Sequence, residues 1–176
     1  MQRHKLIFLG SPGVGKTTAI RAVSDESPVC TDVQSTDEHR STTVALDFGE
    51  LTLADGDVLH LFGVPGQERF KFIWPLVVEG AMGLILMVDN SQETPFDALD
   101  FYLNNFSWSI AQLPTIVAVT RMRPDSRPQL ADYVRHLGQR NFNLPVVAMD
   151  PRERKDVLFL LNMVVALIEK RVAAWN

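Results

Sequence analysis

Short apolar runs alternate with longer amphipathic segments along the 176 residues of the chain. Continuous apolar runs are typical of strands buried on both faces of a sheet. One further segment alternates apolar and polar residues before the turn dipeptide Asp55-Gly56, which predicts an antiparallel hairpin with the apolar run that follows. The predicted strands cover residues 6–9, 44–53, 58–62, 82–88, 116–119 and 146–149.

Segments whose apolar residues recur with helical periodicity lie between these predicted strands. This periodicity is clearest near the end of the chain, where apolar residues recur at Val157, Leu160, Leu161, Val164, Val165 and Ile168. Alternating strands and helices predict an α/β fold of three layers, with helices on both faces of a six-stranded, mostly parallel sheet. We expect a single domain over residues 1–176. The predicted helices cover residues 16–23, 95–106, 128–141 and 152–174, and the polar residues 24–43 are expected to form a long loop.

Composition narrows the class of protein. Hydrophobic residues make up 46% and charged residues 22%, as in globular proteins, and the net charge of −4 favours neither nucleic acid nor an anionic membrane as partner. The single cysteine, Cys30, fits a reducing compartment. No apolar run is long enough to cross a bilayer and neither end carries a lipidation signal, so we expect a cytoplasmic protein without a membrane anchor.

The segment Gly10-Ser11-Pro12-Gly13-Val14-Gly15-Lys16-Thr17 matches the P-loop pattern G-x-x-x-x-G-K-[ST]. It follows a predicted strand and opens a predicted helix, the context in which backbone N–H groups cradle phosphate oxygens. Lys16 is expected to reach the β- and γ-phosphates, and the Thr17 hydroxyl to bind Mg²⁺. The expected nucleotide contacts in this segment are Gly10, Pro12, Gly13, Val14, Gly15, Lys16, Thr17 and Thr18.

A second motif follows the third predicted strand, where residues 61–70 read Leu-Phe-Gly-Val-Pro-Gly-Gln-Glu-Arg-Phe. Together with the P-loop, it resembles the switch II segment of the Ras-like small GTPases, in which D-x-x-G-Q-E follows an apolar strand. The resemblance implies the P-loop NTPase fold of that family. It also implies that the Gly66 N–H meets the γ-phosphate and that Gln67, with Lys16, is catalytic because it orients the attacking water.

The segment Thr43-Val44-Ala45-Leu46-Asp47-Phe48 resembles the end of switch I, where a threonine closes over Mg²⁺ and the γ-phosphate. Thr43 is the expected nucleotide and metal ligand and Thr42 the alternative, although a threonine before a strand is also explained by its β-propensity. Arg40 has the offset of the arginine that stabilises transition-state charge in heterotrimeric G-protein α subunits, which makes it a candidate catalytic residue. A solvated loop arginine is the alternative.

Within the Ras-like family, these two segments look most similar to the bacterial and archaeal MglA-like and conservon-associated small GTPases. That resemblance implies a monomer that binds GTP or GDP with Mg²⁺ and acts through protein regulators and effectors, a Roadblock-fold dimer being one such partner. It implies neither a nucleic-acid partner nor a lipid anchor.

One departure from the Ras-like pattern concerns the metal. Gly63 stands where the family has the aspartate that holds Mg²⁺ through its water shell. Mg²⁺ keeps several waters and needs few protein ligands, so the loss should weaken metal binding rather than abolish it. Asp47 or Asp89 could replace this carboxylate only if the fold brought them close, which we do not expect.

Two further departures concern the base. Residues 120–123, Thr-Arg-Met-Arg, stand where the family has N-K-x-D, so Arg121 is expected to stack on the base while Arg123 cannot accept hydrogen bonds from guanine. Asp125, the nearest acidic residue, lies two residues beyond the position of the family's aspartate. Asp150-Pro151-Arg152 is the best match to the family's S-A-K loop, which makes Asp150 a candidate base contact but places a proline without an N–H at the alanine position.

The sequence therefore favours a small GTP-binding switch with slow intrinsic hydrolysis. The alternative is a degenerate GTPase that acts as a binding scaffold, with or without nucleotide; Gly63, Arg123 and Pro151 favour it, whereas Lys16 and Gln67 oppose it. A P-loop kinase of small molecules is a third hypothesis, but it leaves the Gly-Gln-Glu motif unexplained.

Overall fold

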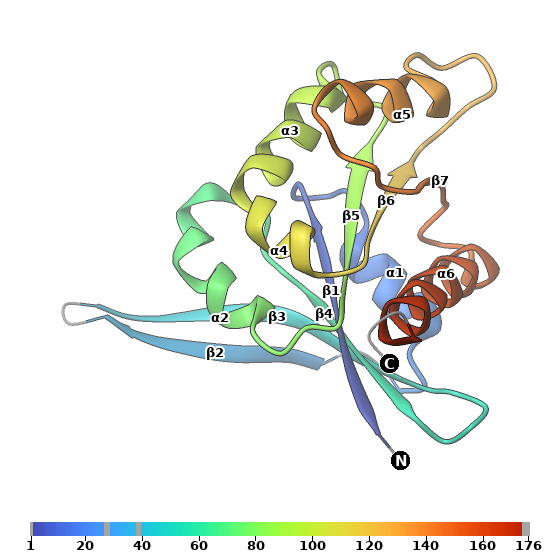
Figure 1. Ribbon diagram of the computed structural model, residues 1–176. Helices are drawn as coiled ribbons and strands as arrows, with labels where there is room; N and C mark the ends of the chain where they lie inside the picture. Colours follow the sequence, from blue (N-terminus) through green and yellow to red (C-terminus); the bar gives the residue numbers. More distant parts are fainter. Residues whose placement is uncertain (1, 27–28, 38–39, 174–176) are drawn as a thin grey trace.

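A central sheet separates two helical layers (Figure 1). The computed structural model describes residues 2–26, 29–37 and 40–173, with side chains described outside residues 27–45 and 172. Within these described residues the sheet has seven strands: β1 (Arg3–Gly10), β2 (Val29–Asp37), β3 (Arg40–Thr52), β4 (Val58–Gly63), β5 (Gly83–Asp89), β6 (Thr115–Thr120) and β7 (Val146–Ala148). The helices are α1 (Lys16–Val23), the 3₁₀ helix η1 (Glu68–Ile73), α2 (Trp74–Val78), α3 (Pro95–Asn105), α4 (Ser107–Gln112), α5 (Leu130–Gln139) and α6 (Arg154–Ala173).

The strand order is β2-β3-β4-β1-β5-β6-β7. β1 is parallel to both β4 and β5, and β6 and β7 continue the parallel part of the sheet. β3 is antiparallel to β4, as the predicted hairpin requires. The mostly parallel α/β fold expected from the sequence is thus confirmed. The carboxyl ends of β1, β4, β5 and β6 meet at one edge, where open α/β sheets bind ligands.

The sheet has one strand more than the six expected. Residues 24–43 were predicted to form a loop, but β2 lies inside this segment and pairs with β3 in an antiparallel register from Val29 opposite Phe48 to Asp37 opposite Arg40. The prediction failed because β2 is an edge strand with a single neighbour, and Val29 and Val33 stand among mostly polar residues without a sustained apolar alternation.

Two separate cores fill the space between the sheet and its helical layers. Alternate residues of β1 belong to opposite cores: Ile7 and Leu9 pack with α2 to α5, whereas Leu6 and Phe8 pack with α1 and α6. Figure 1 shows the same division, with α1 and α6 together on one side of the sheet. The helices predicted for residues 95–106, 128–141 and 152–174 all form, with ends within a few residues of those expected. In the described residues, no helix is both long and apolar enough to span a membrane.

Candidate functional site

The loop between β1 and α1 has the tight curvature of a phosphate-binding loop. Gly10, Gly13 and Gly15 have φ values of 147°, 77° and 111°, in the region where residues with a Cβ are strained. At Gly10 a Cβ would also lie 2.5 Å from the Met87 carbonyl oxygen. α1 then begins without a side-chain cap, so the N–H groups of its first turn are available to an anion. The side chain of Val14 is buried in the core, and its backbone N–H donates a 3.2 Å hydrogen bond to the Ser11 carbonyl within the loop.

Lys16 is buried at the mouth of this loop, with 8% of the residue exposed. Its Nζ donates hydrogen bonds to the carbonyl oxygens of Gly10, at 2.7 Å, and Ser11, at 3.1 Å. Burial lowers the pKa of Lys16 to about 8, although the nearby Asp47 carboxylate acts in the opposite direction. The ammonium is therefore largely removed from water, the setting in which phosphate oxygens would interact with it strongly.

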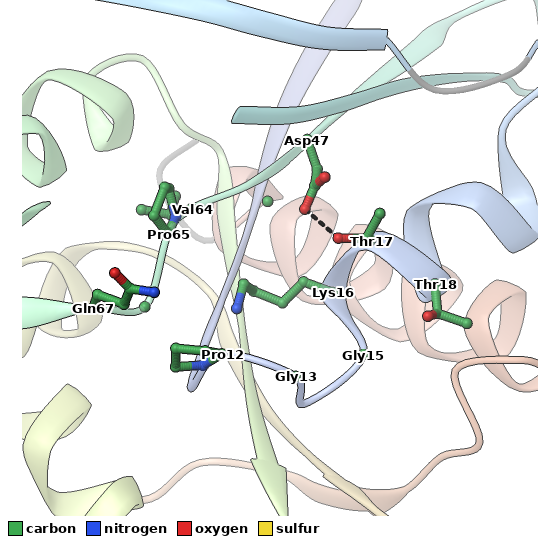
Figure 2. A pocket seen from close by; sticks show the side chains of 12 residues that line it. Pro12, Gly13, Gly15, Lys16, Thr17, Thr18, Asp47, Val64, Pro65 and Gln67 are labelled. Carbon is green, nitrogen blue, oxygen red and sulfur yellow. Dashed lines mark hydrogen bonds between the residues drawn. The ribbon is translucent and has the colours of Figure 1, made fainter. Parts of the chain in front are cut away.

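A cavity of about 330 Å³ opens in front of Lys16 (Figure 2). The Lys16 side chain extends across it toward the side on which Pro12 and Gln67 lie. On the opposite side, the Thr17 hydroxyl donates a 2.5 Å hydrogen bond to Oδ2 of Asp47. The cavity lining brings together the P-loop and the second motif; it consists of Pro12, Gly13, Gly15, Lys16, Thr17, Thr18, Asp47, Gly63, Val64, Pro65, Gly66 and Gln67.

The position of Asp47 corrects the sequence-based expectation. Asp47 was not expected to reach the metal site, but in the β3–β4 hairpin it is the direct cross-strand partner of Gly63. A Cβ at position 63 would lie 3.0 Å from both Cβ and Oδ2 of Asp47, so the glycine leaves the room that this carboxylate occupies. The acidic group missing from the end of β4 is thus supplied by the neighbouring strand. Asp89, as expected, stays away from Thr17 and instead receives hydrogen bonds from Ser91 and Gln92.

The second motif lies directly against the P-loop. A Cβ at Gly66 would be 2.1 Å from the Gly10 carbonyl oxygen, so this close approach requires glycine. The Gly66 carbonyl accepts a 2.9 Å hydrogen bond from the hydroxyl of Tyr102 on α3, a contact that sequence reasoning missed. Burial raises the pKa of Tyr102 to about 12, which keeps the hydroxyl proton in place as donor. Gln67 is exposed and precedes η1, so its amide is free to face the cavity.

The expected switch I residues are placed by their backbone alone. Thr43 lies within β3, opposite Gln34 of β2, rather than in a loop before a strand, and Arg40 is the first residue of β3. The side chains of Thr43, Thr42 and Arg40 lie outside the described residues, so their proposed roles stay predictions.

A second cavity, of about 710 Å³, adjoins the first across Gly13, Gly15 and Thr18. Arg121 lines it, but its guanidinium contacts the Asp89 carboxylate and donates a 3.0 Å hydrogen bond to the Gly13 carbonyl. Burial alone would raise the pKa of Asp89, yet its hydrogen bonds and the charge of Arg121 lower it. Asp150 also lines this cavity. The two cavities therefore meet along the P-loop and share part of its lining.

Comparison with known proteins places these features in a family context. The family described as "Conserved hypothetical ATP binding protein" matches residues 26–169. Over 88 residues the chain is 34% identical to the uncharacterized protein MJ1339 of Methanocaldococcus jannaschii, covering 50% of this chain and 52% of that protein. It is 30% identical over 141 residues to the Ras-related protein Rab-3C of Bos taurus, covering 77% and 58% of the two chains. It is 32% identical over 115 residues to Rab-3 of Caenorhabditis elegans, covering 62% and 49%. The chain thus spans about half the length of these relatives.

The lowered pKa of Lys16 predicts a pH dependence of stability in buffer free of nucleotide and phosphate. Between about 8 and 10.5, the unfolded lysine binds more protons than the folded one, so the free energy of unfolding should rise with pH across this window. The contribution of one such group is at most about 1.4 kcal/mol per pH unit.

Urea unfolding from about pH 7 to about pH 10 measures this effect, because Lys16→Met should lose the rise that the parent chain shows. Lys155→Met, which removes an exposed lysine on α6, is the matched control and should follow the parent curve. Parallel curves for the parent and Lys16→Met would contradict the burial of the ammonium.

Proposed function

We propose that this chain, which belongs to the family of conserved hypothetical ATP binding proteins, works as a nucleotide-dependent switch. Its mostly parallel α/β sheet and its similarity to Ras-related Rab proteins support this proposal. In this proposal it binds GTP and GDP with Mg²⁺ and hydrolyses GTP slowly. The conformations of switch I and switch II would differ between the two nucleotides.

One observation carries the proposal: groups suited to a triphosphate converge on the cavity in front of Lys16. A buried ammonium, a helix N-terminus and the backbone of Gly66 line the same space, and Gln67 stands at its rim. In phosphoryl transfer to water, catalysis is mostly positioning and charge stabilisation, which such an arrangement can provide. Gln67 would orient the water, while Lys16 would stabilise charge on the transferred phosphoryl group.

The residues beside the P-loop fit a magnesium ion. The Thr17 hydroxyl and the Asp47 carboxylate, 2.5 Å apart, are the hard oxygen donors that Mg²⁺ prefers, and Asp47 could act directly or through a water. When bound, Mg²⁺ would neutralise charge on the phosphate oxygens. According to the switch I resemblance, Thr43 would be the third protein ligand of the Mg²⁺ ion.

The partner and the location are proposed on the resemblance to MglA-like proteins. We propose a bacterial, cytoplasmic monomer that acts through protein regulators and effectors, with a Roadblock-fold dimer as one such partner. Supporting a protein contact, Phe72 and Leu76 beside the second motif are 46% and 52% exposed. A few exposed apolar side chains next to a switch segment suit a protein interface.

The first test removes the buried ammonium. Lys16→Ala should weaken binding of a nucleoside triphosphate at least tenfold, about 1.4 kcal/mol, because the phosphates lose their nearest positive charge. Isothermal titration calorimetry on folded protein measures the affinity, with Lys155→Ala on the surface of α6 as control. Equal affinity in the parent and Lys16→Ala would remove the phosphate site from this loop.

The second test addresses Asp47. Asp47→Asn keeps the shape of the side chain but removes its charge, so about tenfold more Mg²⁺ should be needed to slow nucleotide release. Release of a fluorescent nucleotide is followed while Mg²⁺ is titrated. Glu50→Gln, an exposed carboxylate on the same strand, should leave the Mg²⁺ requirement unchanged. If Asp47→Asn also leaves it unchanged, Asp47 does not serve the metal.

The third test separates a switch enzyme from a degenerate scaffold. Gln67→Leu should bind nucleotide like the parent and hydrolyse it at least tenfold more slowly in single-turnover assays, roughly 1.4 kcal/mol in the barrier. The neighbouring exposed residue Glu68, changed to Gln, is the control. Arg40→Ala in the same assay tests the proposed catalytic arginine. Hydrolysis at the parent rate in Gln67→Leu would favour the scaffold or another water-positioning residue.

A further inference from the structure

The cavity beyond the P-loop has the position expected for the base, and its lining differs from what guanine requires. The cavity of about 710 Å³ lies between the P-loop and the loops that follow β6 and β7. A site that selects guanine needs an acceptor for the base's N1–H and 2-amino group and a donor for O6. Both can be looked for among the lining residues, which are Gly13, Gly15, Thr18, Ser91, Arg121, Met122, Arg123, Ala148, Met149, Asp150, Pro151, Arg152 and Asp156.

The backbone donors of the loop after β7 are already engaged. The Asp150 N–H donates to the Asp156 carboxylate at 3.1 Å, and the Arg152 N–H donates to the Asp150 carboxylate at 3.0 Å. Pro151 between them has no N–H. The Met149 N–H pairs with the Val119 carbonyl at 2.9 Å. From Met149 to Arg152, therefore, a carbonyl oxygen on the base finds no uncommitted backbone donor.

Of the two lining carboxylates, Asp150 is fully paired, and one oxygen of Asp156 accepts the hydrogen bond from the Asp150 N–H. Both oxygens of Asp150 accept hydrogen bonds from the Arg152 guanidinium, the shortest at 2.6 Å. Hydrogen bonds from Arg152 lower the pKa of Asp150 to about 2, so the carboxylate stays charged and paired. Arg123, exposed at the cavity, is a cation where an acceptor would be needed. Its own backbone N–H donates to Ser126.

The remaining lining suits any flat ring. Met122 and Met149 are flexible and polarizable side chains that adapt to different partners, and the stem of Arg121 offers a surface for stacking. Stacking contacts act on the face of a base, which guanine and adenine share, rather than on the edge that distinguishes them. Affinity at this site should therefore come mainly from the phosphates.

We propose that this chain is a purine nucleotide site that does not select guanine: its substrate class is purine nucleoside triphosphates, ATP included. This inference rests on the proposed function, since it assumes that the P-loop holds the phosphates. A site with hydrogen bonds dedicated to one base rejects the other strongly, because its polar groups are left unpaired. Here the backbone donors of the loop after β7 and the Asp150 carboxylate pair within the protein whichever base is present, and Arg123 places a cation where guanine needs an acceptor.

Competition titrations with GTP, ATP, inosine triphosphate and xanthosine triphosphate on the full chain test the proposal. The GTP and ATP affinities should lie within about a hundredfold, or about 2.7 kcal/mol, and Lys16→Ala should weaken both alike. A GTP site that excludes ATP by more than about a hundredfold, with binding that still depends on Lys16, would overturn this inference and leave the proposed function standing. Failure of every nucleotide to bind would overturn both.

A second variant tests the location of the base. Arg123→Asp supplies an acceptor at the cavity and should raise the preference for GTP over ATP roughly tenfold. Arg127→Asp is the matched control, because Arg127 is exposed on the same loop but does not line this cavity. If Arg123→Asp leaves the preference unchanged, the base lies elsewhere and the inference fails.

Discussion

The burial of a single charged group, the Lys16 ammonium, constrains the rest of the structure. A cation taken out of water needs hydrogen-bond partners, and here the carbonyl oxygens of Gly10 and Ser11 provide them. They can point at Lys16 because the loop turns through glycines with positive φ. The loop is in turn fixed by β1, which has parallel neighbours on both sides, and by α1, which packs on the sheet. The central position of β1 therefore keeps the ammonium in place.

Strand register decides which acidic group accompanies Lys16. Asp47 and Gly63 are cross-strand partners, so a carboxylate on either strand points into the same space. A carboxylate on β3 instead of β4 preserves the negative charge next to Thr17, because Gly63 on β4 has no side chain to occupy the same space. A register shift of one residue would turn Asp47 to the opposite face of the sheet. The turn at Asp55-Gly56 thus matters to the site although it lies at the far end of the hairpin.

Features with a local signal could be predicted from the sequence, and features that depend on distant contacts could not. The P-loop and α1 were placed correctly because glycine spacing and helical periodicity are local. Asp47 could have been found by counting residues back from the Asp55-Gly56 turn, which pairs Thr52 with Val58 and hence Asp47 with Gly63. β2 could not, because an edge strand with polar side chains lacks the apolar alternation that marks a strand. Nor could the hydroxyl of Tyr102, since its position depends on how α3 packs against the sheet.

The hydrogen bond from the Tyr102 hydroxyl to the Gly66 carbonyl adds to the free-energy cost of moving the segment that contains Gln67. The hydroxyl is partly buried and also bonds the Ser11 side chain, so loss of the Gly66 carbonyl costs about 1 kcal/mol, the net contribution of one hydrogen bond. A ligand that displaces Gly66 has to offset this cost, which lowers its apparent affinity by the same free energy. α3, a helix of the core, is thus coupled energetically to the position of the segment that contains Gln67.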